Sequence, residues 1–221
     1  MEQNVVLRVE NLTKKYRGKT VLDNVSFELK KGSATALVGS NGSGKTTLMR
    51  IIAGLVVPDG GTVSLFGSQN DKELRAARQK SGFLIETPIY YGYMSVKKNL
   101  KLRAGLYGGA TAEYIDELCN RLKLTEYDVG HGRTSLLSYG QKGRYAIAST
   151  LVGKPELLIL DEPFNGLDEE SAMLVYELFR ELREKHGVTL LLSGHVAEQI
   201  QQVCTDTMLI KNGVMSAREE A

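Results

Sequence analysis

The sequence has few of the features that mark secreted, membrane-spanning or disulfide-linked chains. Only two cysteines occur among 221 residues, Cys119 and Cys204, far apart and in no CxxC pair, so we expect reduced thiols. The longest apolar stretch, residues 51–57, is interrupted by Gly54 and falls far short of the roughly 18–20 residues that span a bilayer. The opening MEQNVVLRVE has neither a basic n-region nor an apolar h-region, so we expect no signal peptide and a cytoplasmic location.

An excess of charge of one sign is missing as well. Lys and Arg number 28 against 26 Asp and Glu, a net charge of +2, which disfavours a dedicated nucleic-acid binder while leaving room for a local basic patch. A hydrophobic fraction of 42% and a charged fraction of 24% exclude a disordered or collagen-like chain. Glycine is abundant, at 23 residues, which indicates turns or places where the backbone approaches a ligand closely.

The order of apolar and polar segments predicts one α/β domain over residues 1–221. Strands are expected at 5–9, 21–29, 34–38, 62–66, 157–160, 188–192 and 207–210. Helices are expected after residue 45 (burying Leu48, Ile51, Ile52 and Leu55), at 112–124, at 169–186 (burying Leu174, Leu178 and Leu182) and at 195–203. Alternating strands and helices predict a parallel sheet. We therefore expect a core formed by about 1–86 and 151–221, with a helical lobe inserted at about 87–150.

Residues 39–46 read GSNGSGKT, between a predicted buried strand and a helix, and fit the phosphate-binding pattern G-x-x-x-x-G-K-[ST]. Glycines let the backbone curl so that its N–H groups and the helix N-terminus face an anion. Lys45 can reach the β- and γ-phosphates, and the Thr46 hydroxyl can hold Mg²⁺. A chance glycine turn would not explain Lys-Thr at this spacing. The predicted cradle comprises Gly39, Ser40, Asn41, Gly42, Ser43, Gly44, Lys45, Thr46 and Thr47.

Two carboxylates follow an apolar strand in LLILDEP, residues 157–163. The strand would bring both to the carboxyl edge of the sheet, where open α/β folds bind ligands. Asp161 suits Mg²⁺ coordination, and Glu162 can act as a general base on the attacking water. A solvated acidic turn is the alternative interpretation, and it is weakened by the phosphate cradle elsewhere in the chain.

In this order, the motifs resemble those of the nucleotide-binding subunit of ATP-binding cassette (ABC) transporters over about residues 5–215. The family's LSGGQ signature appears as LSYGQ at 137–141, although read alone this stretch is a helix cap. The resemblance assigns Ser138 and the Gly140 backbone to the γ-phosphate of ATP held by a second subunit, with Gln141 beside them. Tyr139 departs from the family's glycine and could alter how closely the two subunits approach.

The resemblance implies further site residues. NGLD at 165–168 corresponds to the D-loop, whose Asp168 contacts the opposite subunit, and His195 in LLLSGH corresponds to the switch histidine that contacts the γ-phosphate. Tyr16, with Val21 nearby, would stack on adenine. Taken singly, one tyrosine among ten is a weak indication, and a lone histidine after a strand is usually structural.

One departure concerns the residue at the entry to the helical lobe. Glu86 in SGFLIETPIYYGYMSVKKNL stands where the family normally has glutamine, and this stretch is similar to the bacitracin- and lantibiotic-type exporters. A carboxylate is the stronger Mg²⁺ ligand, so Glu86 could tighten metal binding. The aromatic side chains around it, including Tyr90, Tyr91 and Tyr93 with Pro88 and Ile89, either form an exposed groove for a membrane subunit or belong to the lobe core.

As a whole, the resemblance implies a P-loop NTPase (RecA-like) parallel-sheet core with an N-terminal antiparallel β subdomain and an inserted helical subdomain. It implies an ATPase that binds ATP and Mg²⁺, dimerises on ATP and energises an integral membrane transporter subunit at the inner face of the membrane, exporting a peptide antibiotic or another amphiphile. No nucleic acid is expected. The alternatives are a non-transport ABC ATPase acting on nucleic acid or ribosomes, and a regulatory subunit without turnover.

Overall fold

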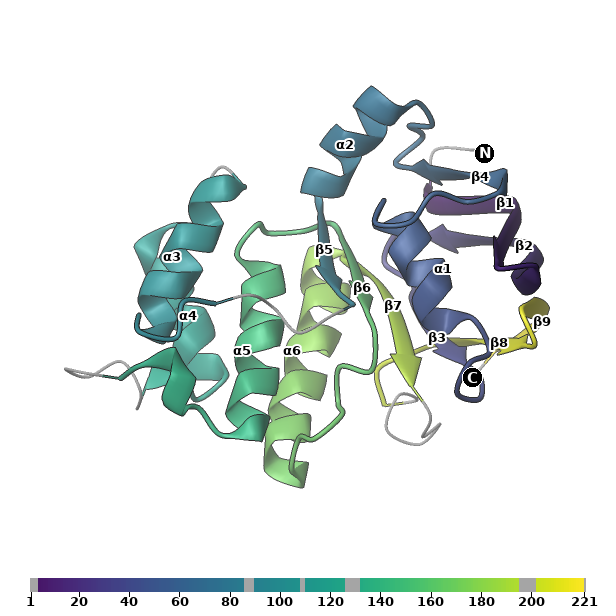
Figure 1. The fold of residues 1–221 in the computed structure, drawn as a ribbon. Coiled ribbons are helices and arrows are strands. Elements are labelled where there is room, and N and C mark those ends of the chain that lie inside the picture. The colour runs from purple at the N-terminus through teal and green to yellow at the C-terminus, as the bar shows by residue number, and fades with distance from the viewer. Residues whose placement is uncertain (1–3, 86–89, 108–109, 126–131, 195–201, 221) are drawn as a thin grey trace.

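The computed structural model describes residues 4–85, 90–107, 110–125, 132–194 and 202–220, and contains two sheets (Figure 1). The smaller sheet is antiparallel, with strand order β2-β1-β4, and consists of β1 (Val5–Tyr16), β2 (Lys19–Lys30) and β4 (Gly60–Leu65). The larger sheet has the order β5-β6-β7-β3-β8-β9 and consists of β5 (Ser81–Leu84), β6 (Leu157–Leu160), β7 (Thr189–Gly194), β3 (Ala34–Val38), β8 (Asp206–Lys211) and β9 (Val214–Glu220). Its first five strands are parallel, and β9 pairs antiparallel with β8.

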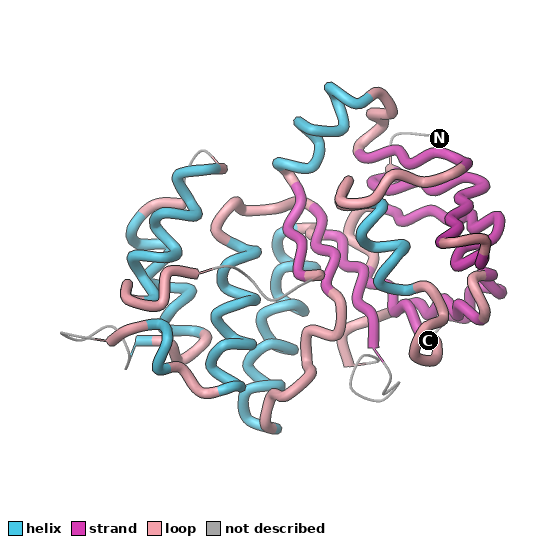
Figure 2. Tube along the Cα trace, viewed as in Figure 1, coloured by secondary structure: helices cyan, strands magenta, loops and turns pink. Residues whose placement is uncertain are grey.

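Among the described residues, seven helical segments accompany the sheets. They are α1 (Lys45–Ile52), α2 (Asp71–Gln79), α3 (Val96–Leu106), α4 (Ala112–Arg121), the 3₁₀ turn η2 (Thr134–Leu136), α5 (Tyr139–Leu151) and α6 (Glu169–His186). Side chains of Asn70, Ser95, Thr111, Ser138 and Asp168 accept backbone N–H groups at the starts of α2 to α6, as N-caps do. Figure 2 shows α3 to α6 gathered on one side of the larger sheet, with α1 and the antiparallel sheet on the other. Leu74 and Ala77 of α2 belong to the core formed with α1.

The central strands are apolar throughout because both of their faces are covered. Leu158 and Leu160 of β6 belong to the core formed with α3 to α6, whereas Leu157 and Ile159 belong to the core formed with α1 and the antiparallel sheet. Successive side chains of a strand point to opposite faces. Because both faces are covered here, every side chain of the run LLIL is buried and apolar. This burial fixes the carboxyl ends of β3 and β6 side by side with β7, where the motifs lie.

The predicted parallel core and antiparallel subdomain are confirmed, and several element predictions need correction. The bounds of β3, β6 and α6 match the expectation, whereas α2, β5 and β9 were not predicted. Helix α1 ends at Ile52, and a turn leaves the Leu55 side chain 64% exposed, so Leu55 does not join the buried stripe. In α6, Leu178 is buried but Leu174 and Leu182 are only half-buried, because the helix turns Val175 and Phe179 to the sheet.

Other expectations meet the structure in part. In the predicted lobe, the described residues form α3, α4, η2 and all but the last residue of α5 without a strand, and α5 packs beside β5 and α6. Most of the helix predicted at 195–203 lies outside the described residues, and its last two positions form a turn.

Cys119 and Cys204 are buried and form no disulfide, and burial raises the pKa of the Cys204 thiol to about 12. No helix in the described part of the chain is long and apolar enough to cross a bilayer.

Candidate functional site

The loop between β3 and α1 is packed so closely that two of its glycines are required. A Cβ on Gly39 would meet the Ser43 hydroxyl at 2.6 Å and would overlap the Ile210 carbonyl oxygen. Gly44 has φ +113°, and a Cβ there would lie 2.8 Å from both the Val21 carbonyl and the Leu22 side chain. Larger residues would therefore push the loop away from β2 and β8 and deform the phosphate cradle.

Lys45, the first residue of α1, supplies a buried positive charge inside this loop. Its side chain is 5% exposed, and its Nζ donates to the backbone carbonyls of Gly39 at 2.6 Å and Ser40 at 3.2 Å. The hydroxyl of Ser43 is buried in the same loop and has no hydrogen-bond partner among the described residues. A buried ammonium, an unused hydroxyl and the positive end of a helix dipole together fit a polyphosphate.

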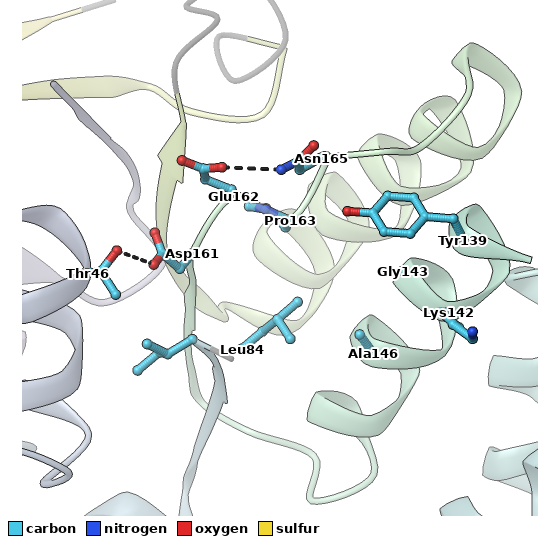
Figure 3. Close-up of a pocket in the computed structure, with 11 residues that line it drawn as sticks. Thr46, Leu84, Tyr139, Lys142, Gly143, Ala146, Asp161, Glu162, Pro163 and Asn165 are labelled. Carbon is cyan, nitrogen blue, oxygen red and sulfur yellow. Dashed lines mark hydrogen bonds between the residues drawn. The ribbon is translucent and has the colours of Figure 1, made fainter. Parts of the chain in front are cut away.

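The Asp161 carboxylate, at the end of β6, reaches α1, although β7 lies between β6 and β3 in the sheet. The Thr46 hydroxyl donates to Oδ2 of Asp161 at 2.6 Å, as Figure 3 shows, and the Asp161 backbone N–H donates to the carbonyl of Leu84 at 2.6 Å. The predicted metal-ligand pair is thus brought together across 115 residues of sequence. One hydroxyl and one carboxylate fit Mg²⁺, which is usually held by one or two carboxylates plus phosphate oxygens and water. The described residues contain no cluster of three or more His, Cys, Asp or Glu side chains, the kind that would hold a metal without the nucleotide.

Ser193 of β7 completes this arrangement and was missed by the sequence reasoning. Its hydroxyl donates to Oδ1 of Asp161 and accepts the backbone N–H of Glu162 at 3.0 Å, and the residue is fully buried. Both carboxylate residues are therefore held by one side chain on the neighbouring strand. The only signal in the sequence is a hydroxyl that directly follows an apolar run, in LLLSG.

Glu162 follows Asp161 directly and turns into the cleft in front of α5. Its backbone has φ +51°, an uncommon conformation for a residue other than glycine. Its Oε2 accepts a hydrogen bond from Nδ2 of Asn165 at 3.4 Å, and Figure 3 shows these two side chains pointing toward each other. The carboxylate is partly exposed at the carboxyl end of β6, where a general base could reach a water molecule.

The cleft in front of these groups has a volume of about 460 Å³ and two walls. One wall is the core edge with Thr46, Leu84, Ile85, Asp161, Glu162, Pro163 and Asn165, and the other is α5 with Tyr139, Lys142, Gly143 and Ala146. The predicted signature residues lie at the N-terminus of α5. There Ser138 and Gln141 form a capping box, in which the Ser138 hydroxyl accepts the Gln141 N–H and the Gln141 amide oxygen accepts the Ser138 N–H.

Of the remaining predicted site residues, one lies at the phosphate cradle, two lie elsewhere in the fold, and two lie outside the described residues. Val21 contacts the cradle through its carbonyl beside Gly44, while Tyr16 lies at the end of β1, 44% exposed, with the Lys14 ammonium 5.3 Å from its ring. Asp168 caps α6 by accepting the Ser171 N–H at 2.7 Å, and this hydrogen bond lowers the pKa of the Asp168 carboxyl. The predicted metal ligand Glu86 and the predicted switch residue His195 lie outside the described residues.

Of the tyrosines after residue 89, one packs in the core of the helical lobe and two are exposed. Tyr90 is half-buried and packs edge-to-face on Tyr145, with ring centroids 5.6 Å apart. Tyr91 and Tyr93 are 48% and 67% exposed, and their ring centroids lie 5.9 Å apart. Buried Asn99 fixes their loop, because its amide exchanges hydrogen bonds with both backbone groups of Tyr91 and donates to the Thr134 hydroxyl.

Comparisons with known proteins identify the family. The family model for ABC transporters matches residues 22–165. The chain is 35% identical to the uncharacterized ABC transporter ATP-binding protein YdbJ of Bacillus subtilis (strain 168) and to the bacitracin transport ATP-binding protein BcrA of Enterococcus faecalis. These alignments cover 96% and 92% of this chain and 68% and 65% of those proteins, so the chain spans about two thirds of their length. The dimeric post-hydrolysis structure of the cassette MJ0796 with ADP and Pi superposes with a TM-score of 0.84 at 25% identity, covering 97% of this chain and 98% of that one. The chain therefore belongs to the ABC transporter family, as one of its ATP-binding, ATP-hydrolysing subunits.

Proposed function

We propose that the chain hydrolyses Mg²⁺-bound ATP at the edge formed by β3, β6 and β7, dimerises when ATP is bound, and drives a membrane subunit that exports a peptide antibiotic or another amphiphile. The observation that carries the proposal is the 2.6 Å contact between Thr46 and Asp161 beside buried Lys45 and in front of Glu162. It joins a cationic phosphate cradle to a pair of carboxylates in one cleft.

Each residue of this edge has a distinct task. Lys45 exchanges its contacts with the loop carbonyls for phosphate oxygens, and Thr46 and Asp161 hold Mg²⁺. When bound, the ion neutralises charge that develops on the phosphates. Glu162 orients the attacking water and accepts its proton, while Ser193 keeps the Glu162 backbone and the Asp161 carboxylate in register.

A second copy of the chain fits the exposed start of α5. The capping box uses the Ser138 oxygen as an acceptor, which leaves its hydroxyl hydrogen to donate to a phosphate. Tyr139 beside it is 69% exposed, a large area for an aromatic side chain. The MJ0796 neighbour is described as dimeric with ADP and Pi bound, which supports the same assembly here.

A membrane partner and the direction of transport rest on other observations. The name of the bacitracin transport relative supports export of a peptide antibiotic or a similar amphiphile. Tyr91 and Tyr93 offer an aromatic docking surface, already fixed by Asn99, that suits a short helix of a membrane subunit. Glu86, which lies outside the described residues, remains a proposed Mg²⁺ ligand.

Replacing Glu162 by Gln tests the catalytic and dimeric parts together. Because Gln cannot accept the proton, ATP turnover should fall by about 10²- to 10⁴-fold while ATP binding persists. Sedimentation with saturating Mg²⁺-ATP should show a dimer that disappears without nucleotide. Glu169→Gln, the same change at an exposed position in the first turn of α6, is the matched control and should behave as wild type. A Glu162→Gln chain that still hydrolyses ATP at the normal rate would exclude Glu162 as the base.

Capturing the partner tests the transport part. Tagged Glu162→Gln chain, purified from gently solubilised membranes with Mg²⁺-ATP, should retain a multi-span membrane protein. Tyr91→Ser/Tyr93→Ser should lose that protein, whereas Leu102→Ser/Leu106→Ser, which removes comparably exposed side chains from α3, should keep it. Recovery of ribosomes or nucleic acid instead would support the non-transport alternative.

A further inference from the structure

Tyr139, where the signature departs from the family's glycine, lies against the turn that follows the carboxylate pair. A Cβ placed on Gly166 would overlap Cδ1 and Cε1 of the tyrosine ring and lie 3.0 Å from its Cζ. The ring therefore covers the Gly166 backbone directly, although 69% of Tyr139 stays exposed to solvent. In Figure 3 the hydroxyl end of Tyr139 is directed toward Pro163 and Asn165 across the cleft.

The turn under the ring is anchored at both ends and adjustable in its middle. Phe164 is buried and packs on Tyr176 and Phe179, with ring centroids 4.6 Å and 6.1 Å away. Asp168 is held by its cap on α6. Between them Gly166 has φ +72°, a conformation that glycine adopts most easily, so contact with the ring restricts the most permissive residue of the turn.

The residue before Gly166 connects the turn to the proposed general base. Asn165 donates its side-chain N–H to Oε2 of Glu162 at 3.4 Å, and its backbone N–H to the Glu162 carbonyl at 3.0 Å. A shift of the turn at Gly166 would therefore move the hydrogen-bond donor that faces the Glu162 carboxylate. The start of α5 is thus linked to Glu162 of the same chain through one ring and one amide.

We propose that Tyr139 is a positioning residue for Glu162: its ring holds the turn at Gly166, and Tyr139 and Gly166 form a matched pair in which a side chain at one position requires space at the other. The inference rests on the proposed role of Glu162 as general base. The aromatic ring performs this task and not its hydroxyl, because the overlap involves ring carbons.

A double-mutant cycle on the purified chain measures the coupling, with kcat and KM for ATP as the readouts. Gly166→Ala alone should lower kcat by about tenfold because its methyl group displaces the ring or the turn. The same change in a Tyr139→Gly background should cost no more than about twofold. Alanine at positive φ is strained in both backgrounds, so this cost cancels in the cycle.

Single substitutions separate positioning from structure. Tyr139→Gly should lower kcat by about fivefold with KM for ATP within about twofold of wild type, because the phosphate cradle is untouched. Tyr139→Phe should restore kcat to the wild-type value. Leu136→Ala, an equally exposed side chain in η2, should change neither parameter and is the control. Thermal unfolding of every variant checks that the proteins are folded. If Gly166→Ala does not fold, the comparison of kcat between Tyr139→Gly and Tyr139→Phe tests the proposal by itself.

The outcomes distinguish this inference from the proposed function. Additive effects in the cycle, or a kcat that stays unchanged or rises in Tyr139→Gly, would overturn the positioning role while Glu162→Gln remains inactive. If Glu162→Gln retains normal turnover, the proposed role of Glu162 fails first, and the positioning role fails with it.

Discussion

The two walls of the cleft are held in different ways. On the core edge, Lys45 and Ser193 are buried. The Lys45 ammonium donates to two carbonyls of its own loop, and the Asp161 carboxylate accepts from hydroxyls of α1 and β7. On the α5 wall, Tyr139 is largely exposed, and what holds it is the cap of its own helix and the shape of Gly166. Under the proposed function, the core edge is preorganised for phosphate and metal, whereas the α5 wall is the surface that a second copy covers.

The largest difference between the two walls is expected when the positive charge of Lys45 is removed from the core edge. Lys45→Ala should weaken ATP binding by about 10- to 100-fold, because a charge-assisted hydrogen bond to phosphate contributes roughly 1.5–3 kcal/mol. Lys142→Ala, on the α5 wall, should leave the ATP affinity of the monomer within about twofold. Titration with a fluorescent ATP analogue measures both. Equal losses from the two variants would mean that both walls bind the nucleotide within one chain.

Ser193→Ala tests whether one hydroxyl maintains the core edge. Its loss should lower kcat by about tenfold and raise the Mg²⁺ concentration for half-maximal activity. It should also destabilise the fold by about 1–3 kcal/mol, because it leaves the partly buried Glu162 N–H without its acceptor. Steady-state phosphate release over a range of Mg²⁺ concentrations and urea unfolding provide the measurements. Wild-type Mg²⁺ dependence in the variant would show that Asp161 needs no such support.

Thr35→Val is the counterpart on the neighbouring strand β3. Thr35 is as fully buried as Ser193, but within the part of the chain that the structure describes its hydroxyl has no hydrogen-bond partner. Replacing it with a methyl group should stabilise the fold by about 1 kcal/mol, since a buried unsatisfied hydroxyl is removed, and should leave turnover unchanged. Urea unfolding curves compare the two proteins. A destabilised Thr35→Val chain would contradict the difference drawn between the two hydroxyls.

The smallest expected effect concerns pH. The Ser171 N–H lowers the pKa of Asp168 below its ordinary value of 3.8, so the ionised cap contributes stability above that value and loses it as pH falls through the lowered pKa. The stability advantage of wild type over Asp168→Asn should therefore shrink when the pH is lowered from 5 to below 3.8. Thermal unfolding of both proteins at several pH values follows this difference. An advantage that grows with acidity would reverse the assigned sign.

Patterns that are local in sequence predicted the core of the fold and most of the site. The apolar strand 157–160 and the loop 39–46 each specify their own conformation, so Lys45, Thr46 and the two carboxylates could be located before the structure was known. Ser193 could not, because its role arises only when β6 and β7 pair in register across about 30 residues of sequence. The contact of Tyr139 with Gly166 depends on the packing of α5 against a turn, and no periodicity encodes it.

The hydrogen bonds of Asn99 have a thermodynamic consequence for any partner that meets the Tyr91–Tyr93 surface. Ordering a backbone costs about 1–2 kcal/mol per residue at room temperature, and for the turn at 91–95 this cost is met when the chain folds. Docking would then proceed as contact between rigid shapes, with little loss of conformational entropy on this side of the interface. Asn99→Ala should transfer that cost to the binding step, so that affinity falls even though neither tyrosine has been changed.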